Sequence, residues 1–243
     1  MIEARGLNKS FGPVIAVHDV SFSARDGAIT GLVGPNGAGK STTLRMLYTV
    51  LRPDAGSAFI DEMDVVRSPL AVREQLGVLP HSSGVYPNLT ARENVRYFGA
   101  LHGLRGDRLH ARVDELLNLL DLQAIADRRA KGFSQGEKVK VAIARALVHA
   151  PRNLILDEPT NGLDVMAIRT LRDVLRRLRD QGTCILFSSH VMQEVTALCD
   201  AAVVIGRGCV LAQGSPDQIK TATDTTSLED AFVALLGRPP EAV

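Results

Sequence analysis

The most informative stretch of this sequence is Gly34-Pro35-Asn36-Gly37-Ala38-Gly39-Lys40-Ser41. It has the spacing G-x-x-x-x-G-K-[ST], follows an apolar run at 28–33 and precedes a run at 41–51 whose leucines recur at helical spacing. Glycines in such a loop let consecutive backbone N–H groups turn toward phosphate oxygens, and the start of a helix adds partial positive charge. The sequence therefore predicts a strand, a phosphate-binding loop (P-loop) and a helix.

Two polar side chains end this loop. Lys40 is expected to reach the β and γ phosphates of a nucleoside triphosphate, and the Ser41 hydroxyl is expected to ligate Mg²⁺. A chance glycine-rich turn is the alternative, but such a turn would not require a strand before it and a helix after it. The context therefore favours a nucleotide site.

A pair of carboxylates ends a second apolar run, Leu154-Ile155-Leu156-Asp157-Glu158. The carboxyl ends of parallel strands are where ligands of α/β proteins bind. Asp157 would hold Mg²⁺ through water, and Glu158 would polarise the attacking water, a role that needs a carboxylate within hydrogen-bond reach. Alone, the pair could be a solvated acidic turn; together with the P-loop it is interpreted as catalytic.

The remaining segments predict an α/β fold. The first third is interpreted as short strands, and 72–131 as mostly helical, with Thr90 and Glu93 forming a capping box. Apolar runs of strand length, typical of parallel strands covered on both faces, follow at 153–158, 183–190 and 200–208. A short amphipathic helix is expected to start near Ser227, and the proline-rich end after it is expected to fray.

Length and composition narrow the class of protein further. A chain of 243 residues suffices for one large domain, or for one core with a smaller inserted subdomain. Apolar residues make up 45% and charged residues 23%, which argues against a disordered chain. The 28 basic and 27 acidic residues leave no basic excess, so nucleic acid is not expected as a partner. No run of about 18 to 20 apolar residues could span a bilayer, and the N-terminal residues lack a secretory signal, so we expect the chain to stay in the cytosol.

Two further segments carry a resemblance to a known family. Residues 133–137 read FSQGE, and residues 141–164 read VAIARALVHAPRNLILDEPTNGLD. Together they resemble the signature, Walker B strand and D-loop of the ABC ATPases, a combination that P-loop GTPases and RecA-like ATPases do not carry. In that family the signature is a second phosphate site at a helix start. Ser134-x-x-Glu137 is also an ordinary capping box, so both interpretations stay open.

The resemblance covers nearly the whole chain and implies its fold. The fold would be a P-loop NTPase of ABC ATPase type, with a RecA-like core sheet, an N-terminal antiparallel β subdomain and an inserted α-helical subdomain. The ABC ATPase domain would span 1–220, with the helical subdomain inserted at about 82–150. A short C-terminal helix and tail would occupy 221–243.

The resemblance also implies roles for single residues. Lys40, Glu158 and His190 would be catalytic, with His190 as the switch histidine that contacts the γ-phosphate. Phe11 would stack on adenine, although an aromatic residue here is on its own more often a core ring. Nucleotide would be bound by Phe11, Val17, Gly34, Pro35, Asn36, Gly37, Ala38, Gly39, Lys40, Ser41, Thr42, Ser134, Gln135, Gly136 and Asp164, the last being the D-loop aspartate that links two ATP sites.

The sequence departs from the family pattern at three places. His81 stands where the Q-loop glutamine is expected, so Mg²⁺ would be held by Ser41, Asp157 and this histidine. An exposed loop residue is the alternative for His81. The signature reads Ser-Gln-Gly-Glu where Ser-Gly-Gly-Gln is commoner, and the D-loop reads Asn-Gly where Ser-Ala is usual.

Within the family, the sequence is similar to the ATPase subunits of ABC-2-type exporters, above all the sodium-export (NatA) type. This similarity is carried by residues 77–104 and by the segments FSQG and LDEPTNGLDVMA. The resemblance implies a hydrolase that uses ATP and Mg²⁺ and pairs head to tail with a second ATPase subunit, in a homodimer. It further implies that an integral membrane permease carries the cargo, with this chain peripheral on the inner face of the cell membrane.

Alternative functions remain at this point. The ATPase subunits of drug, lipid and polysaccharide exporters share many of these sequence motifs. A soluble ABC ATPase for DNA repair, chromosome structure or ribosome work is a candidate from another class, but those proteins generally carry coiled coils, zinc modules or tandem cassettes that this sequence lacks. A non-catalytic regulatory subunit is disfavoured by Lys40, Asp157, Glu158 and His190.

Overall fold

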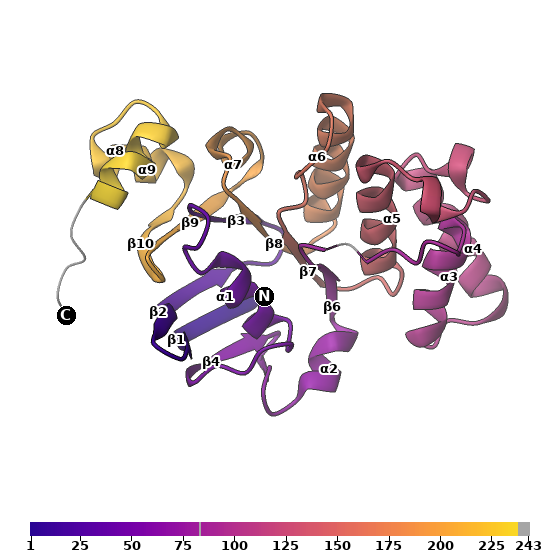
Figure 1. Ribbon diagram of the computed structural model, residues 1–243, viewed down its shortest axis with the longest axis horizontal. Helices are drawn as coiled ribbons and strands as arrows, with labels where there is room; N and C mark the ends of the chain where they lie inside the picture. Colours follow the sequence, from indigo (N-terminus) through magenta and orange to yellow (C-terminus); the bar gives the residue numbers. More distant parts are fainter. Residues whose placement is uncertain (83, 238–243) are drawn as a thin grey trace.

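The computed structural model describes residues 1–82 and 84–237, which form two β-sheets with helices packed around them (Figure 1). The larger sheet has six strands, in the order β10 (Cys209–Gly214), β9 (Ala201–Gly206), β3 (Ile29–Val33), β8 (Cys184–Ser189), β7 (Asn153–Asp157) and β6 (Leu76–Leu79). All neighbours are parallel except β10, which runs antiparallel to β9. Strands β3, β7 and β8 are buried along their whole length, as their continuous apolar runs predicted.

The smaller sheet is antiparallel and lies next to the N-terminus (Figure 1). Its strands are β2 (Val14–Ala24), β1 (Ile2–Phe11), β4 (Ala55–Ile60) and β5 (Met63–Asp64). Helix α1 (Lys40–Leu47) packs between the two sheets and contributes Leu44, Met46 and Leu47 to their shared core. The helix is shorter than the predicted run at 41–51, because the chain turns at Thr49, whose φ of 67° is incompatible with a continuing helix.

Helices follow β6 and precede β7, in the region predicted to be helical. They are α3 (Ala91–Leu101), α4 (Gly106–Leu119), two short 3₁₀ turns (Gln123–Ile125 and Ala130–Gly132) and α5 (Gln135–Leu147). The capping box of Thr90 and Glu93 is confirmed at the start of α3. The stretch is mostly helical, as expected, but it also contains strand β6, which was not predicted because it gains its hydrogen bonds from β7 and four residues are too few for a visible pattern. The expected domain limits stay a prediction.

The C-terminal third covers the other parts of the large sheet. Helices α6 (Val165–Asp180) and α7 (Met192–Leu198) lie above the sheet in Figure 1, and α2 (Pro69–Glu74) lies near β6. Helices α8 (Pro216–Thr223) and α9 (Leu228–Gly237) pack beside β10, and only the second was predicted. The proline-rich end that was expected to fray lies outside the described residues.

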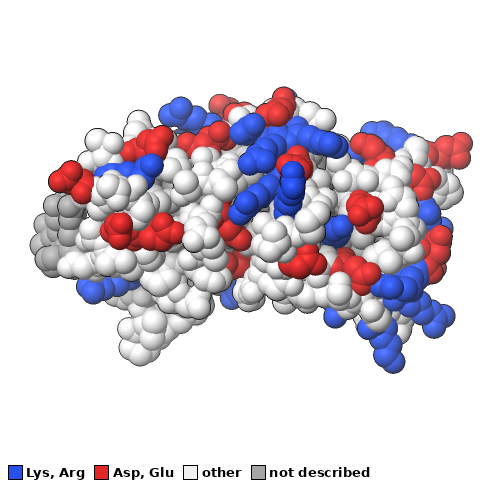
Figure 2. All heavy atoms as spheres, turned by 90° about the horizontal axis from the view of Figure 1, so that it is seen from above, with Lys and Arg blue, Asp and Glu red and all other residues white. Residues whose placement is uncertain are grey.

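The charge on one face of the molecule is uneven. Figure 2 shows basic side chains gathered over α6, which carries Arg169, Arg172, Arg176, Arg177 and Arg179. Acidic residues lie among them: Arg176 pairs with Asp173, and Arg179 lies 3.4 Å from Asp200. Within the residues described, no helix has the length and apolar character to cross a membrane.

Candidate active site

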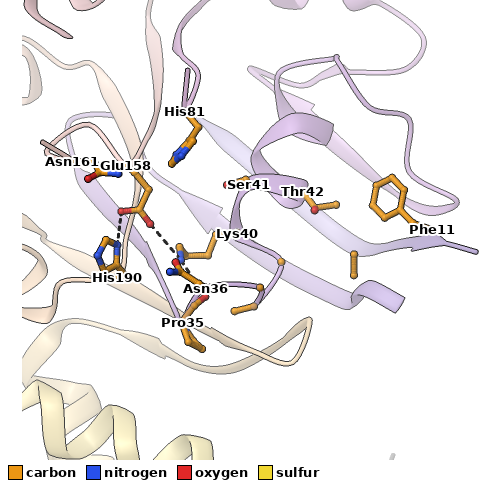
Figure 3. Close-up of a pocket in the computed structure, with 14 residues that line it drawn as sticks. Phe11, Pro35, Asn36, Lys40, Ser41, Thr42, His81, Glu158, Asn161 and His190 are labelled. Atoms are coloured by element: carbon orange, nitrogen blue, oxygen red, sulfur yellow. Dashed lines mark hydrogen bonds and ion pairs between the residues drawn. The ribbon is translucent and has the colours of Figure 1, made fainter. Parts of the chain in front are cut away.

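A cavity of about 550 Å³ opens at the carboxyl end of β3, where the P-loop joins α1 (Figure 3). We call it the P-loop cavity. The predicted loop residues from Pro35 to Thr42 border it on one side, and His81, Glu158 and His190 border it on the other. The structure thus brings together segments that are more than a hundred residues apart in sequence.

The loop geometry explains its residue types. Gly39 has a φ of 101°, and a Cβ added there would lie 2.4 Å from the carbonyl oxygen of Ala16, so only glycine fits. Helix α1 begins at the next residue, which places a helix start at the cavity wall. An anion in the cavity would therefore meet unpaired backbone N–H groups and the positive end of a helix dipole.

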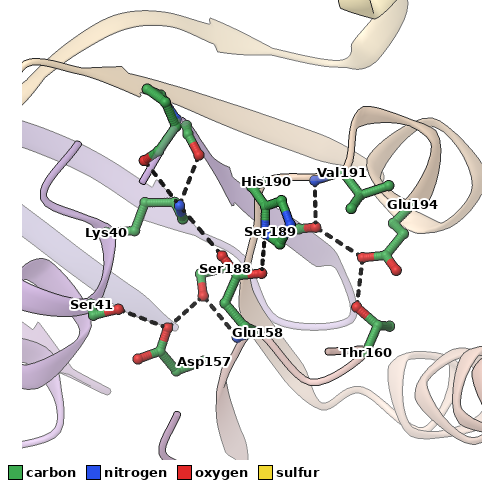
Figure 4. A network of polar contacts seen from close by, with 12 residues as sticks. Lys40, Ser41, Asp157, Glu158, Thr160, Ser188, Ser189, His190, Val191 and Glu194 are labelled. Carbon is green, nitrogen blue, oxygen red and sulfur yellow. Dashed lines mark hydrogen bonds and ion pairs between the residues drawn. The ribbon is translucent and has the colours of Figure 1, made fainter. Parts of the chain in front are cut away.

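Lys40 is only 5% exposed. Its Nζ donates hydrogen bonds to the carbonyl oxygens of Gly34, at 2.8 Å, and Pro35, at 3.2 Å, and lies 3.4 Å from Glu158 Oε1. A buried ammonium needs such partners, because taking its charge out of water is costly. These contacts hold the cation at the base of the loop (Figure 4), and Lys40 lines the cavity (Figure 3).

Asp157 ends β7 with its carboxylate buried and shared between two hydroxyls. Its Oδ1 accepts hydrogen bonds from Ser188 Oγ, at 2.7 Å, and Ser41 Oγ, at 3.1 Å (Figure 4). Its Oδ2 is buried and has no hydrogen-bond partner among the described residues. Burial and the charge of Asp157 raise the pKa of the Tyr48 phenol nearby, which keeps that group protonated.

Glu158 lies between two basic groups. Besides its ion pair with Lys40, its Oε2 lies 2.8 Å from His190 Nδ1. Its backbone is in the left-handed region, with φ 52°, and its N–H donates to Ser188 Oγ at 2.9 Å. The parallel pairing of β7 with β8 sets this arrangement, because it aligns Asp157 with Ser188 at the ends of the two strands.

His81 borders both the P-loop cavity and a neighbouring cavity of about 260 Å³. Asp157, Glu158 and Gln135 also border the smaller cavity. The histidine that replaces the expected glutamine is an exposed loop residue, as the alternative held, and it also lies at the cavity wall opposite Glu158 (Figure 3).

Phe11 and Val17, both expected to bind nucleotide, differ in their exposure. Phe11 is 49% exposed at the edge of the P-loop cavity, with Lys9 Nζ 5.8 Å from its ring centroid, so it is not a core ring. Val17 is fully buried under the loop, and Ala16 borders the cavity in its place.

The signature residues and the D-loop aspartate do not border the P-loop cavity of their own chain. Ser134 caps α5 in a complete capping box: its Oγ accepts the N–H of Glu137, and Glu137 Oε2 accepts the N–H of Ser134. Asp164 caps α6 by accepting the N–H of Ala167 at 2.8 Å. The capping interpretation of Ser134 is therefore confirmed, and its phosphate-binding role stays a prediction.

Sequence reasoning missed four polar residues near the acidic pair (Figure 4). Ser188 bonds to Asp157 and to the backbone of Glu158, whereas Thr160 and Ser189 both bond to Glu194. One signal was available. The run at 183–190 ends in two serines and a histidine, and hydroxyls at the end of an otherwise apolar buried strand need specific partners.

Comparison with known proteins identifies the family. The ABC transporter family model matches residues 17–161. The chain is 40% identical over 226 residues to the ABC transporter ATP-binding protein NatA of Bacillus subtilis, covering 93% of this chain and 92% of that protein. It is also 40% identical over 218 residues to the Nod factor export ATP-binding protein I of Bradyrhizobium diazoefficiens, covering 90% and 71% of the two chains.

The fold agrees with this assignment. A solved structure described as the ATP-binding subunit of an ABC transporter superposes with a TM-score of 0.89 and 30% identity, covering 97% of this chain and 99% of that chain. The predicted fold class is thereby confirmed. This chain therefore belongs to the ABC transporter family, as an ATP-binding subunit that hydrolyses ATP to energise transport.

Proposed function

We propose that ATP binds in the P-loop cavity and is hydrolysed with the help of Glu158. The observation that carries this proposal is the position of its carboxylate, 3.4 Å from Lys40 Nζ and 2.8 Å from His190 Nδ1 at the cavity wall. Lys40 would stabilise the charge on the β and γ phosphates, and His190 would contact the γ-phosphate. Glu158 would accept a hydrogen bond from the attacking water. Phe11, exposed at the cavity edge, is suited to stack on the adenine.

We propose that Ser41 and Asp157 hold a Mg²⁺ ion. The buried Asp157 Oδ2 supports the fit, because a carboxylate oxygen without a donor is costly unless a cation or its bound water approaches it. When bound, the ion would neutralise charge on the phosphates. His81 would face the same region and take the part of the glutamine usual at its position.

We propose that a second copy of this chain completes each site, so that Ser134, Gln135 and Gly136 of one chain face the P-loop of the other. Gly136 supports this, because the nearest atom that a Cβ added there would meet among the described residues is a Leu163 methyl carbon at 3.7 Å, an ordinary contact distance. Its own fold therefore does not demand glycine, whereas close approach of a phosphate would. ATP would stabilise the closed pair, and hydrolysis would let it reopen.

We propose that the pair drives export through a separate membrane permease, at the inner face of the cell membrane. The resemblance of the sequence to ATPase subunits of the sodium-export type favours Na⁺ as the cargo. The comparable identity to a Nod factor export protein keeps a drug, lipid or polysaccharide as the second candidate. Sealed vesicles that contain this chain with its permease would test the proposal: ATP-dependent movement of ²²Na⁺ supports it, and hydrolysis without such movement favours the second candidate.

Two substitutions test the site. Glu158→Gln removes the carboxylate but keeps the shape, so we expect ATP-stabilised dimers with turnover reduced at least about a hundredfold. Lys40→Ala removes the cation that faces the phosphates, so we expect nucleotide binding to be lost. Size-exclusion chromatography with ATP, steady-state hydrolysis and titration calorimetry would measure these effects.

The opposite results would contradict the site. A Glu158→Gln variant that stays monomeric with ATP would count against the dimer. Unchanged ATP affinity in the Lys40→Ala variant would refute the assignment of the P-loop. Thr223→Val, in α8 and outside the cavity, is a control that should change neither property.

A further inference from the structure

Glu194 is a buried carboxylate outside the P-loop cavity, on the first turn of α7. It is 6% exposed, and a single oxygen, Oε2, accepts hydrogen bonds from two hydroxyls. One is Thr160 Oγ1 and the other is Ser189 Oγ, each at 2.8 Å (Figure 4). A carboxylate in this position is kept only where its hydrogen bonds are satisfied, so the two hydroxyls and the acid form one unit.

The two hydroxyls come from the two segments that carry the acidic residue and the histidine of the site. Thr160 lies two residues after Glu158, and Ser189 directly precedes His190. Ser189 Oγ also accepts the N–H of Val191 at 3.0 Å, which fixes the backbone on the far side of the histidine. Glu194 therefore joins the loop after β7 to the end of β8.

The backbone at Glu158 needs such support. Its φ of 52° places a non-glycine residue in the left-handed region, a conformation that persists only where the surroundings impose it. On the strand side, Ser188 Oγ accepts the N–H of Glu158 at 2.9 Å. On the loop side, the carbonyl oxygen of Glu158 accepts the N–H of Asn161 at 3.2 Å, and the bond from Thr160 to Glu194 fixes this turn to α7.

We propose that Glu194 is a positioning residue for hydrolysis: by holding Thr160 and Ser189 on one oxygen, it keeps Glu158 and His190 in contact. This inference rests on the roles proposed above for those two residues. Glu194 does not border the P-loop cavity, so it acts through them and not on the nucleotide. It should therefore affect the rate of hydrolysis and leave ATP binding almost unchanged, because small displacements of catalytic groups lower kcat steeply.

Three variants separate this role from ordinary folding. Glu194→Gln keeps an oxygen that can accept both hydroxyls, whereas Glu194→Met has a similar length and no oxygen. Val195→Ala, the next residue of α7, removes buried apolar volume without touching the two hydroxyls, so it serves as a control for lost stability. Kd for ATP, kcat, KM and Tm would be measured for each, with the full chain and its partner subunits.

We expect kcat of Glu194→Met to fall by about tenfold or more, with Kd for ATP within about threefold of the parent value. Glu194→Gln should stay within about threefold of the parent kcat, and Val195→Ala should lower Tm without a comparable loss of kcat. In a double-mutant cycle, Thr160→Val and Ser189→Ala should be non-additive in kcat, because both act through the same oxygen.

Two results would overturn the inference. One is a Glu194→Met variant whose kcat matches that of Val195→Ala at equal Tm. The other is additive loss of kcat in the cycle. Glu158→Gln, measured alongside, distinguishes the inference from the site itself: if turnover survives that change, the site is wrong, and if turnover is lost while Glu194→Met stays active, only the role of Glu194 is wrong.

Discussion

The hydroxyl of Ser188 links the carboxylate of Asp157 to the backbone of Glu158. It donates to Asp157 Oδ1 and accepts the N–H of Glu158. In Ser188→Ala both groups lose a buried partner, so we expect the free energy of unfolding to fall by about 1–3 kcal/mol. We also expect kcat to fall about tenfold, because the left-handed backbone at Glu158 loses its strand-side anchor. Urea denaturation and steady-state hydrolysis measure the two effects. If the variant is destabilised but its kcat is unchanged, the Ser188 hydroxyl contributes to stability and not to hydrolysis.

Residues whose interactions are set locally could be predicted from the sequence, and residues that meet across strands could not. Glycines and a lysine at fixed spacing predicted the P-loop. The position of the acidic pair at the end of an apolar run predicted its role in the site. The bond between Ser188 and Asp157 joins residues 31 positions apart and depends on which strands pair and in which register. The position of Val17, buried beneath the loop, likewise depends on how the small sheet packs.

At the scale of elements, Asp164 tests whether the start of α6 is structural or functional. Its carboxylate caps the helix by accepting the N–H of Ala167. We expect Asp164→Ala to lower the free energy of unfolding by about 1 kcal/mol, and Asp164→Asn to change it by only a few tenths, because asparagine caps as well as aspartate. If the charge also links two ATP sites, both variants should lose cooperativity in the dependence of hydrolysis on ATP concentration. Normal cooperativity in Asp164→Asn would leave capping as the role.

The helical layer contains a histidine that should make stability depend on pH. His149 follows α5 and stacks on His102 at the end of α3, with ring centroids 3.7 Å apart. Burial, together with the neighbouring His102, lowers the pKa of His149 to about 4. Since histidine in an unfolded chain titrates near pH 6.5, the unfolded chain takes up the proton first as pH falls from about 6.5 to about 4, and stability is lost over that range.

We expect this loss to reach about 1–2 kcal/mol between about pH 7 and pH 5, a value reduced for the partial exposure of the ring. His149→Phe keeps an aromatic ring on His102 and removes the titrating group, so its stability should vary less over the same range. Urea denaturation at several pH values measures the difference. An equal slope in both proteins would place the pH dependence elsewhere.

Helix α8 was not predicted, although its sequence contains a helix-start signal. Ser215, Pro216 and Gln218 form a capping box with proline at the first helical position, and the structure contains both bonds of that box. Strand β6 had no comparable signal, because its four residues pair with β7 only in the folded protein. Short elements that depend on tertiary contacts are the part of this fold that sequence patterns leave open.

At the scale of the whole molecule, the proposed dimer predicts complementation between two inactive variants. Lys40→Ala disables the P-loop, and Gly136→Glu places a carboxylate where the phosphate of the other chain would lie. Each homodimer should be inactive, but a mixed dimer contains one site with an intact P-loop from one chain and an intact signature from the other. Mixing equal amounts should restore about a quarter of the parent activity. No recovery would argue against head-to-tail pairing.

The two serines at the end of β8 give this strand an unusual sensitivity to length. Neighbouring side chains of a strand point to opposite faces, so Ser188 serves the acidic pair and Ser189 serves Glu194. Deleting a single residue before Ser188 in this strand would turn each following side chain to the other face of the sheet, so that Ser188 leaves Asp157 and Ser189 leaves Glu194. Many substitutions in this strand should be milder than such a deletion, because the deletion separates Asp157 and Glu194 from their serine partners at the same time.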